Sequence, residues 1–144
     1  MPLTGTRVMV VEDSMKDLKQ CMAVLQRMGA AHVDALTNVS AAKVKLEEAV
    51  EGNGEAPGLI VLDLNFPNES GFEVLRLWRG DARLKKIPMV VWTVMGETEK
   101  ELCRFFGASV VAKYEGEAEL EKTVKVAVAG QRRPAEDDQT GRVM

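Results

Sequence analysis

The sequence contains few of the residues that mark secreted, metal-thiolate or membrane proteins. Cys21 and Cys103 are its only cysteines, and their spacing fits no metal motif, so we expect two buried thiols rather than a disulfide. No apolar run is long enough to cross a membrane, and the N-terminal segment lacks the length and cleavage pattern of a signal peptide. These absences predict a cytoplasmic protein without a membrane partner.

Positive charge is also scarce. The 19 Lys and Arg residues are outnumbered by 22 Asp and Glu residues, and the formal net charge is −3. A domain without a basic surface is not expected to bind nucleic acid directly. The length of 144 residues suits one domain with its own hydrophobic core and is too short for two ordinary domains.

Short apolar runs alternate with segments of helical periodicity along the chain. The runs predict strands at residues 7–11, 32–36, 59–62, 89–92 and 109–112, each followed by a helix. Several runs are apolar throughout, which is typical of a parallel sheet covered on both faces. The pattern predicts an α/β, doubly wound (βα)5 flavodoxin-like fold with a five-stranded parallel sheet in the order 2-1-3-4-5.

The same periodicity assigns helix faces and the limits of the domain. In the fourth expected helix, Leu102, Phe105 and Phe106 are predicted to face inward. The folded domain is expected over residues 1–130. Residues 131–144 are polar and have little to bury, so they are predicted to form a disordered tail.

Polar residues follow the strands at the points where the strands end. Glu12 and Asp13 follow the first strand and Asp63 the third, while Thr93 and Lys113 follow the fourth and fifth. Singly, each has an ordinary explanation as a helix cap, a strand residue or a surface charge. In the predicted topology, however, all five lie at one edge of the sheet, where ligands of such folds bind.

Three converging carboxylates predict a bound cation. Each pair repels by roughly 1 to 4 kcal/mol at a separation of about 4 Å, so the acids need a positive partner. Ligands that are all oxygens favour a hard ion, and room for water and phosphate favours Mg2+. Asp63 could then attack a phosphoryl group, with Lys113 and Thr93 binding the phosphoryl oxygens.

Four motifs together resemble one family. VVED, VLDLNFPNESGFEVL, VVWT and GASVVAK, in this order, are similar to the receiver domain of two-component response regulators, over roughly residues 6 to 130. The resemblance implies that Asp63 is the phosphoacceptor and that a histidine kinase or a phosphotransfer protein is the donor. It also implies that Thr93 is the switch hydroxyl and Lys113 the phosphate-binding lysine.

The resemblance extends to the metal ligands. Asp13 corresponds to a direct Mg2+ ligand, and Glu12 to the second acid, acting through a water molecule. The backbone carbonyl of Asn65 corresponds to a further ligand. With Asp63, these residues complete the Mg2+ site that the resemblance implies.

Three positions depart from the family pattern. Val110 stands where the family usually has the aromatic residue of the switch, and Val94 stands where the residue after the threonine is usually small. Tyr114 replaces the proline that normally follows the lysine through a cis bond. Because a cis bond before a non-proline residue costs about 3 to 4 kcal/mol, we expect a trans Lys113–Tyr114 bond and a different loop.

Three functions remain open from the sequence. The favoured one is a stand-alone, non-enzymatic response regulator that signals to a downstream protein or relay partner, with homodimerisation possible. The second is a receiver-like binding module that works without phosphorylation. The least favoured is a phosphohydrolase with an aspartyl nucleophile, because Asn65 stands where such enzymes need a second acid.

Overall fold

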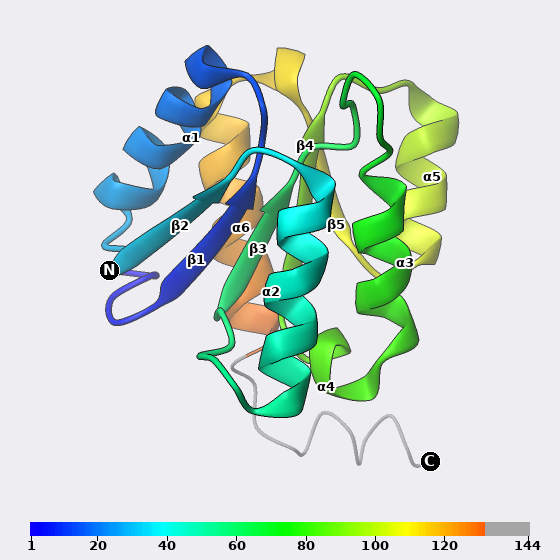
Figure 1. Cartoon of the computed structure of the whole chain (residues 1–144). Coiled ribbons are helices and arrows are strands. Elements are labelled where there is room, and N and C mark those ends of the chain that lie inside the picture. The colour runs from blue at the N-terminus through cyan, green and yellow to red at the C-terminus, as the bar shows by residue number, and fades with distance from the viewer. Residues whose placement is uncertain (132–144) are drawn as a thin grey trace, which may run out of the picture.

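The computed structural model describes residues 1–131, so the predicted disorder of the tail falls, from residue 132 on, outside the described residues. The described chain forms a parallel sheet with helices on both faces (Figure 1). The strands are β1 (Arg7–Val11), β2 (His32–Leu36), β3 (Leu59–Leu62), β4 (Met89–Thr93) and β5 (Ser109–Ala112). The helices are α1 (Met15–Arg27), α2 (Val39–Glu51), α3 (Phe72–Gly80), α4 (Ala82–Lys85), α5 (Glu97–Phe105) and α6 (Glu117–Gln131), and a 3-10 turn (Lys113–Glu115) follows β5.

The sheet confirms the predicted topology. Its five strands are parallel and run in the order β2-β1-β3-β4-β5. Val11 is aligned with Leu36 on one side and with Leu62 on the other, so β1, β2 and β3 end at the same level. Because the winding reverses between β1 and β3, the residues that follow these strands border the crevice where such sheets bind ligands.

Two hydrophobic layers hold the helices against the sheet. Alternate strand residues point to opposite faces, so each strand contributes to both layers. On one face, Val8, Val10, Leu59 and Val61 pack with α1 and α6. On the other, Met9, Val11, Ile60 and Leu62 pack with α2, α3, α4 and α5. Figure 1 shows these helices over one face of the sheet. Burial on both faces explains why these strands are apolar throughout.

Short polar side chains fix the starts of the first two helices. Ser14 precedes α1, and its hydroxyl accepts the backbone N–H of Asp17 at 3.3 Å. Asn38 caps α2 in the same way through the N–H of Ala41 at 2.8 Å. These caps satisfy N–H groups that have no partner inside a helix.

The predicted inward face of α5 is wrong in two of its three residues. Leu102 and Phe105 are 42% and 74% exposed, and only Phe106 is partly buried against the core. Cys103 and Lys100 face inward instead. The helix has nine residues and buries a narrow stripe, so its remaining apolar side chains stay on the surface.

The short helix α4 was not predicted from the sequence. Asp81 caps it by accepting the N–H groups of Arg83 and Leu84 at 2.8 and 3.3 Å. With four residues, the helix is too short to show a periodic pattern, and Leu84 is its only buried residue.

The two cysteines are buried and unpaired, as predicted. Burial raises the pKa of the Cys21 thiol to about 12. Within residues 1–131, no helix combines the length and the hydrophobicity needed to cross a bilayer.

Candidate functional site at the carboxyl edge of the sheet

Backbone hydrogen bonds extend the sheet by one residue and position two acids. The N–H of Asp63 donates to the carbonyl of Val11 at 3.0 Å, and the N–H of Glu12 donates to the carbonyl of Leu36 at 2.9 Å. Both acids therefore continue their strands, and their side chains are fixed at the edge where the strand order reverses. The sequence predicted this placement from the position of each acid directly after a buried strand.

The structure brings together the three acids that follow the strands. Carboxylate oxygens of Glu12, Asp13 and Asp63 all lie within 4.8 Å of one another. Glu12 and Asp63 are buried, and Asp13 is the most exposed of the three. The group can hold a cation from its open side.

Lys113 neutralises part of this acidic group. Its Nζ lies 2.8 Å from Glu12 Oε1 and 3.2 Å from Asp63 Oδ2. A fourth acid, Asp17 in the first turn of α1, lies closer still, with Oδ2 at 2.7 Å from the same nitrogen. Asp17 was missed in the sequence analysis, because it follows no strand and lies 96 residues from its partner.

Burial favours the protonated form of the Glu12 carboxyl group. Removal from water raises its pKa to about 7, and the charge of Asp63 acts in the same direction. The contact with Lys113 and the N–H of Ser14, which donates to Glu12 Oε2 at 3.1 Å, oppose the shift without cancelling it. Glu12 is therefore the acid of this site that a cation would most benefit.

Lys113 keeps its charge although it is half-buried. Burial by itself lowers the pKa of the lysine, but the hydrogen bond to Asp17 and the contact with Glu12 outweigh it. The charge of Asp63 adds to them, and the net pKa of Lys113 is raised. An ammonium group is thus held beside Asp63 at neutral pH.

The donor atoms fit Mg2+. Each of the three acids offers carboxylate oxygens, and no His or Cys belongs to the group, so a hard ion is preferred over zinc. Glu12 Oε1 is buried, and its partner is the Lys113 ammonium at 2.8 Å. A buried carboxylate oxygen beside two other acids is a suitable ligand for a cation.

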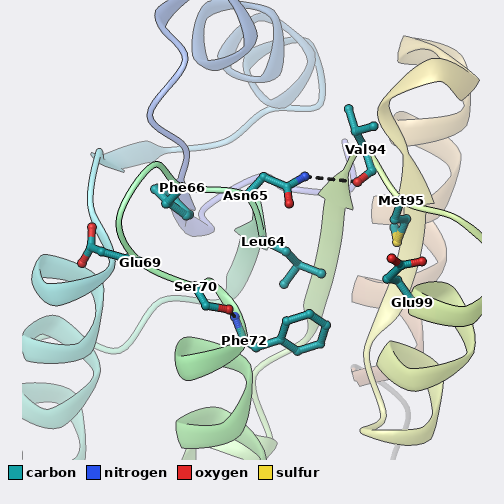
Figure 2. Close-up of a pocket in the computed structure, with 9 residues that line it drawn as sticks. All are labelled: Leu64, Asn65, Phe66, Glu69, Ser70, Phe72, Val94, Met95 and Glu99. Carbon is teal, nitrogen blue, oxygen red and sulfur yellow. Dashed lines mark hydrogen bonds between the residues drawn. The ribbon is translucent and has the colours of Figure 1, made fainter.

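Thr93 is bound to Asp63 in this structure. Its hydroxyl donates to Asp63 Oδ1, and the backbone N–H of Asn65 donates to the same oxygen at 3.1 Å. The Asn65 side chain also takes part, which the sequence analysis did not foresee. Its amide donates to Thr93 Oγ1 at 3.0 Å and to the carbonyl of Val94 at 3.1 Å, as Figure 2 shows for Val94.

A pocket of about 300 Å³ adjoins the hydroxyl side of the site. It lies between the loop after β3 and the start of α5, and Asn65 and Val94 meet across its rim (Figure 2). Phe72 and Leu64 form an apolar wall of the pocket, whereas Glu69 lies on the side of the pocket away from Val94. The pocket places solvent next to the residues that position Thr93.

Two of the positions that depart from the family pattern lie in β5 and in the turn that follows it. Val110 is partly buried against the core, and the Lys113–Tyr114 bond is trans, as predicted. Lys113 to Glu115 form a 3-10 turn, and Tyr114 is 70% exposed. The buried Lys100 of α5 pairs with Glu115 at 3.1 Å and lies 5.7 Å from the centre of the Tyr114 ring.

Comparisons with known proteins agree with this site. The family model of the response regulator receiver domain matches residues 8–125. Response regulator Rcp1 of Synechocystis sp. is 38% identical over 88 residues, which cover 60% of this chain and 60% of Rcp1. Chemotaxis protein CheV1 of Helicobacter pylori is 28% identical over 121 residues, covering 82% of this chain and 36% of CheV1.

A solved structure gives the same result. The Mn2+-bound form of response regulator Rcp1 superposes with a TM-score of 0.70 at 27% identity, covering 96% of this chain and 97% of that one. The matched segments span only 36% of the length of CheV1 and 60% of the length of Rcp1. The fold and the acidic site are thus those of a known signalling domain.

Proposed function

The chain belongs to the response regulator receiver domains of two-component systems, and on that premise we propose that Asp63 accepts a phosphoryl group. The observation that carries the proposal is the Lys113 ammonium, 3.2 Å from Asp63 Oδ2, in a site that also gathers Glu12 and Asp13. Phosphoryl transfer to Asp63 needs a nucleophilic carboxylate, a positively charged hydrogen-bond donor such as the Lys113 ammonium, and a group of acids that binds a metal ion.

We propose that Mg2+ is held by carboxylate oxygens of Glu12, Asp13 and Asp63, with the backbone carbonyl of Asn65 as a further ligand. The carboxylate oxygens of Glu12, Asp13 and Asp63, all within 4.8 Å of one another, support this assignment. When bound, the ion would offset negative charge on the carboxylates and on the phosphoryl oxygens. Glu12 gains most, because burial has raised its pKa to about 7 and the ion favours its charged form.

The transfer conserves atoms and charge through one bond exchange. A carboxylate oxygen of Asp63 forms a bond to phosphorus while the bond from phosphorus to the donor breaks, and the donor leaves with the bonding electron pair. For a phosphohistidine donor whose other ring nitrogen is protonated, the leaving group is the neutral imidazole. Lys113 is placed to bind one phosphoryl oxygen, and the Thr93 hydroxyl could turn from Asp63 Oδ1 to donate to another.

The activity that follows is signalling. We propose that a histidine kinase or a phosphotransfer protein supplies the phosphoryl group and that a downstream protein reads the phosphorylated state. An enzymatic role is disfavoured because the side-chain amide of Asn65, which donates hydrogen bonds to Thr93 and Val94, does not ionise near neutral pH and so cannot act as an acid or a base. We propose that the signal uses movement of the 3-10 turn after β5, whose Glu115 pairs with Lys100 at 3.1 Å, because Val110 stands where the family usually has the switch aromatic.

The test is phosphorylation by a small donor. The protein is incubated with acetyl phosphate and Mg2+, and its mass is measured intact. We expect the gain of one phosphoryl group, dependent on Mg2+ and absent in Asp63→Asn. A wild-type protein that stays unmodified, or an Asp63→Asn variant that is modified equally, would contradict the proposal, and repeated turnover of donor would indicate a phosphohydrolase.

A further inference from the structure

We propose that Asp17 is a positioning residue that holds the Lys113 ammonium in place for the phosphoryl group. The inference rests on the proposed function of Asp63 and assigns a role to an acid outside the metal-binding group. Asp17 Oδ2 lies 2.7 Å from Lys113 Nζ, which is the shortest of the three carboxylate contacts of that nitrogen.

The three carboxylates that contact Lys113 have different roles during phosphorylation. An ammonium group has three N–H donors, and in this structure Glu12, Asp17 and Asp63 supply one oxygen for each. Cation binding draws on Glu12, and phosphorylation converts the carboxylate of Asp63 into an acyl phosphate. Of the described acids around Lys113, Asp17 alone keeps its contact through both events.

Asp17 is well placed for a fixed contact. It does not belong to the group of acids whose oxygens lie within 4.8 Å of one another, so it stands on the lysine side of the site. Its backbone N–H is bound by Ser14, and the next residues of α1, including Leu18 and Cys21, are buried against the sheet. The helix therefore holds this carboxylate at a fixed distance from the end of β5.

The contact differs from an ordinary surface ion pair. Exposed pairs contribute little, because water screens them and both side chains lose freedom. Here the lysine side chain is only 14% exposed, and its ammonium also lies 5.0 Å from the centre of the Trp92 ring. Without Asp17, the ammonium would be drawn toward Glu12 and Asp63, where it competes with the cation for the same oxygens.

Kinetics test the inference directly. The rate constant for acetyl phosphate labelling in Mg2+ is measured for wild type, Asp17→Ala, Asp17→Asn and Glu119→Ala. Glu119 is a matched control, since it is a first-turn acid of α6 and makes no ion pair with Lys113. We expect about tenfold slower labelling in Asp17→Ala, as for a lost charge-assisted hydrogen bond, a smaller loss in Asp17→Asn, and no change in Glu119→Ala.

A double-substitution cycle separates positioning from other effects. If Asp17 acts through Lys113, adding Asp17→Ala to Lys113→Ala should not slow labelling further. An unchanged rate in Asp17→Ala, or an equal loss in both backgrounds, overturns the inference. Should the alanine variant fail to fold by circular dichroism, Asp17→Asn decides the matter, and a rate equal to wild type then overturns it.

Trp92 gives a readout that does not depend on phosphorylation. The chain has two tryptophans, so a nitrogen-15 NMR spectrum shows two indole signals, and Trp78 lies in the other hydrophobic layer. In Asp17→Ala without donor, we expect the Trp92 signal to shift and the Trp78 signal to stay. A Trp92 signal that does not move overturns the inference, whereas a wild type that cannot be labelled overturns only the role of Asp63.

Discussion

At the scale of single residues, the position of an acid after a strand was predictable and its partners were not. Glu12 and Asp63 follow buried strands, and parallel strands must end at a common edge, so their meeting follows from topology. Asp17 lies on a helix, and its contact with Lys113 depends on how α1 is rotated over the sheet. The Asn65 amide likewise requires the conformation of two loops, which one-dimensional patterns do not contain.

Glu12 makes the stability of the cation-free protein depend on pH. Its pKa is about 7 when folded against an ordinary value of 4.5, so between these values the folded state holds a proton that the unfolded chain has lost. The contribution of Glu12 to the free energy of unfolding is therefore fully present at low pH. It is lost as the pH rises through the folded pKa, and the loss is about 3 kcal/mol at most. We expect urea unfolding in EDTA to show this slope in wild type and to lose it in Glu12→Gln.

The control for this pH dependence is Glu119→Gln, which removes a surface acid and should keep the wild-type slope. Added Mg2+ should flatten the slope in wild type, because a cation stabilises the ionised carboxylate. A slope that is the same in Glu12→Gln and wild type would show that Glu12 does not titrate in this range.

Val94 bears on the lifetime of the acyl phosphate. Its carbonyl is bound by Asn65 and its side chain stands at the rim of the site, where the family usually has a smaller residue. We expect a branched side chain there to limit the approach of water to phosphorus. We expect Val94→Ala to shorten the acyl-phosphate lifetime several-fold, measured by the loss of the phosphorylated mass after the donor is removed.

Val126→Ala is the matched control for this lifetime, because Val126 is also an exposed valine but lies on α6, outside the site. Its acyl phosphate should decay at the wild-type rate. Equal lifetimes for Val94→Ala and wild type would mean that Val94 does not restrict water.

At the scale of elements, the strands were predicted within one residue and the small helices were not. A strand buried on both faces is a continuous apolar run, which the sequence displays directly, and only β4 extends one residue further, to Thr93. For α5, the apolar residues exceed what its narrow buried stripe can cover, so Phe105 stays exposed beside Arg79. The inward lysine, Lys100, has no apolar signature, and its position is explained by its ion pairs with Glu115 at 3.1 Å and Glu97 at 3.7 Å.

The connection from β3 to α3 depends on the absence of a side chain at Gly71. A Cβ atom there would lie 2.3 Å from the carbonyl oxygen of Asp63 and 2.6 Å from Cα of Leu64. Both neighbours are backbone atoms next to the phosphoacceptor, so they cannot yield without moving it. We expect Gly71→Ala to lower the free energy of unfolding by roughly 1 to 3 kcal/mol and to slow labelling of Asp63.

Gly80→Ala is the control from the same helix, since a Cβ atom at Gly80 meets nothing within 4 Å. Alanine favours the helical backbone, so this variant should be as stable as wild type or slightly more stable. If Gly71→Ala unfolds at the same urea concentration as Gly80→Ala, the close approach of the helix to Asp63 has no energetic consequence.

At the scale of the whole molecule, the described residues complete both hydrophobic layers. In sequence, the buried residues of the layer on the side of α1 and α6 extend from Leu3 to Val128. Those of the opposite layer end at Ala112. Among residues 1–130, whose burial the structure describes, the last buried one is Val128, two positions before the predicted end of the domain. The described residues thus cover both faces of the sheet.

We therefore expect a chain that ends at residue 130 to fold and to react as the full chain does. Substantial loss of stability requires the loss of buried contacts, and the described core retains all of its members, so the melting temperature should stay within about 2 °C. The rate of Asp63 labelling should also be unchanged, because every residue of the site precedes Glu117, where α6 begins. Calorimetry and acetyl phosphate labelling of both chains measure this, and a lower melting temperature or a slower reaction in the shorter chain would show that residues 131–144 contribute to the domain.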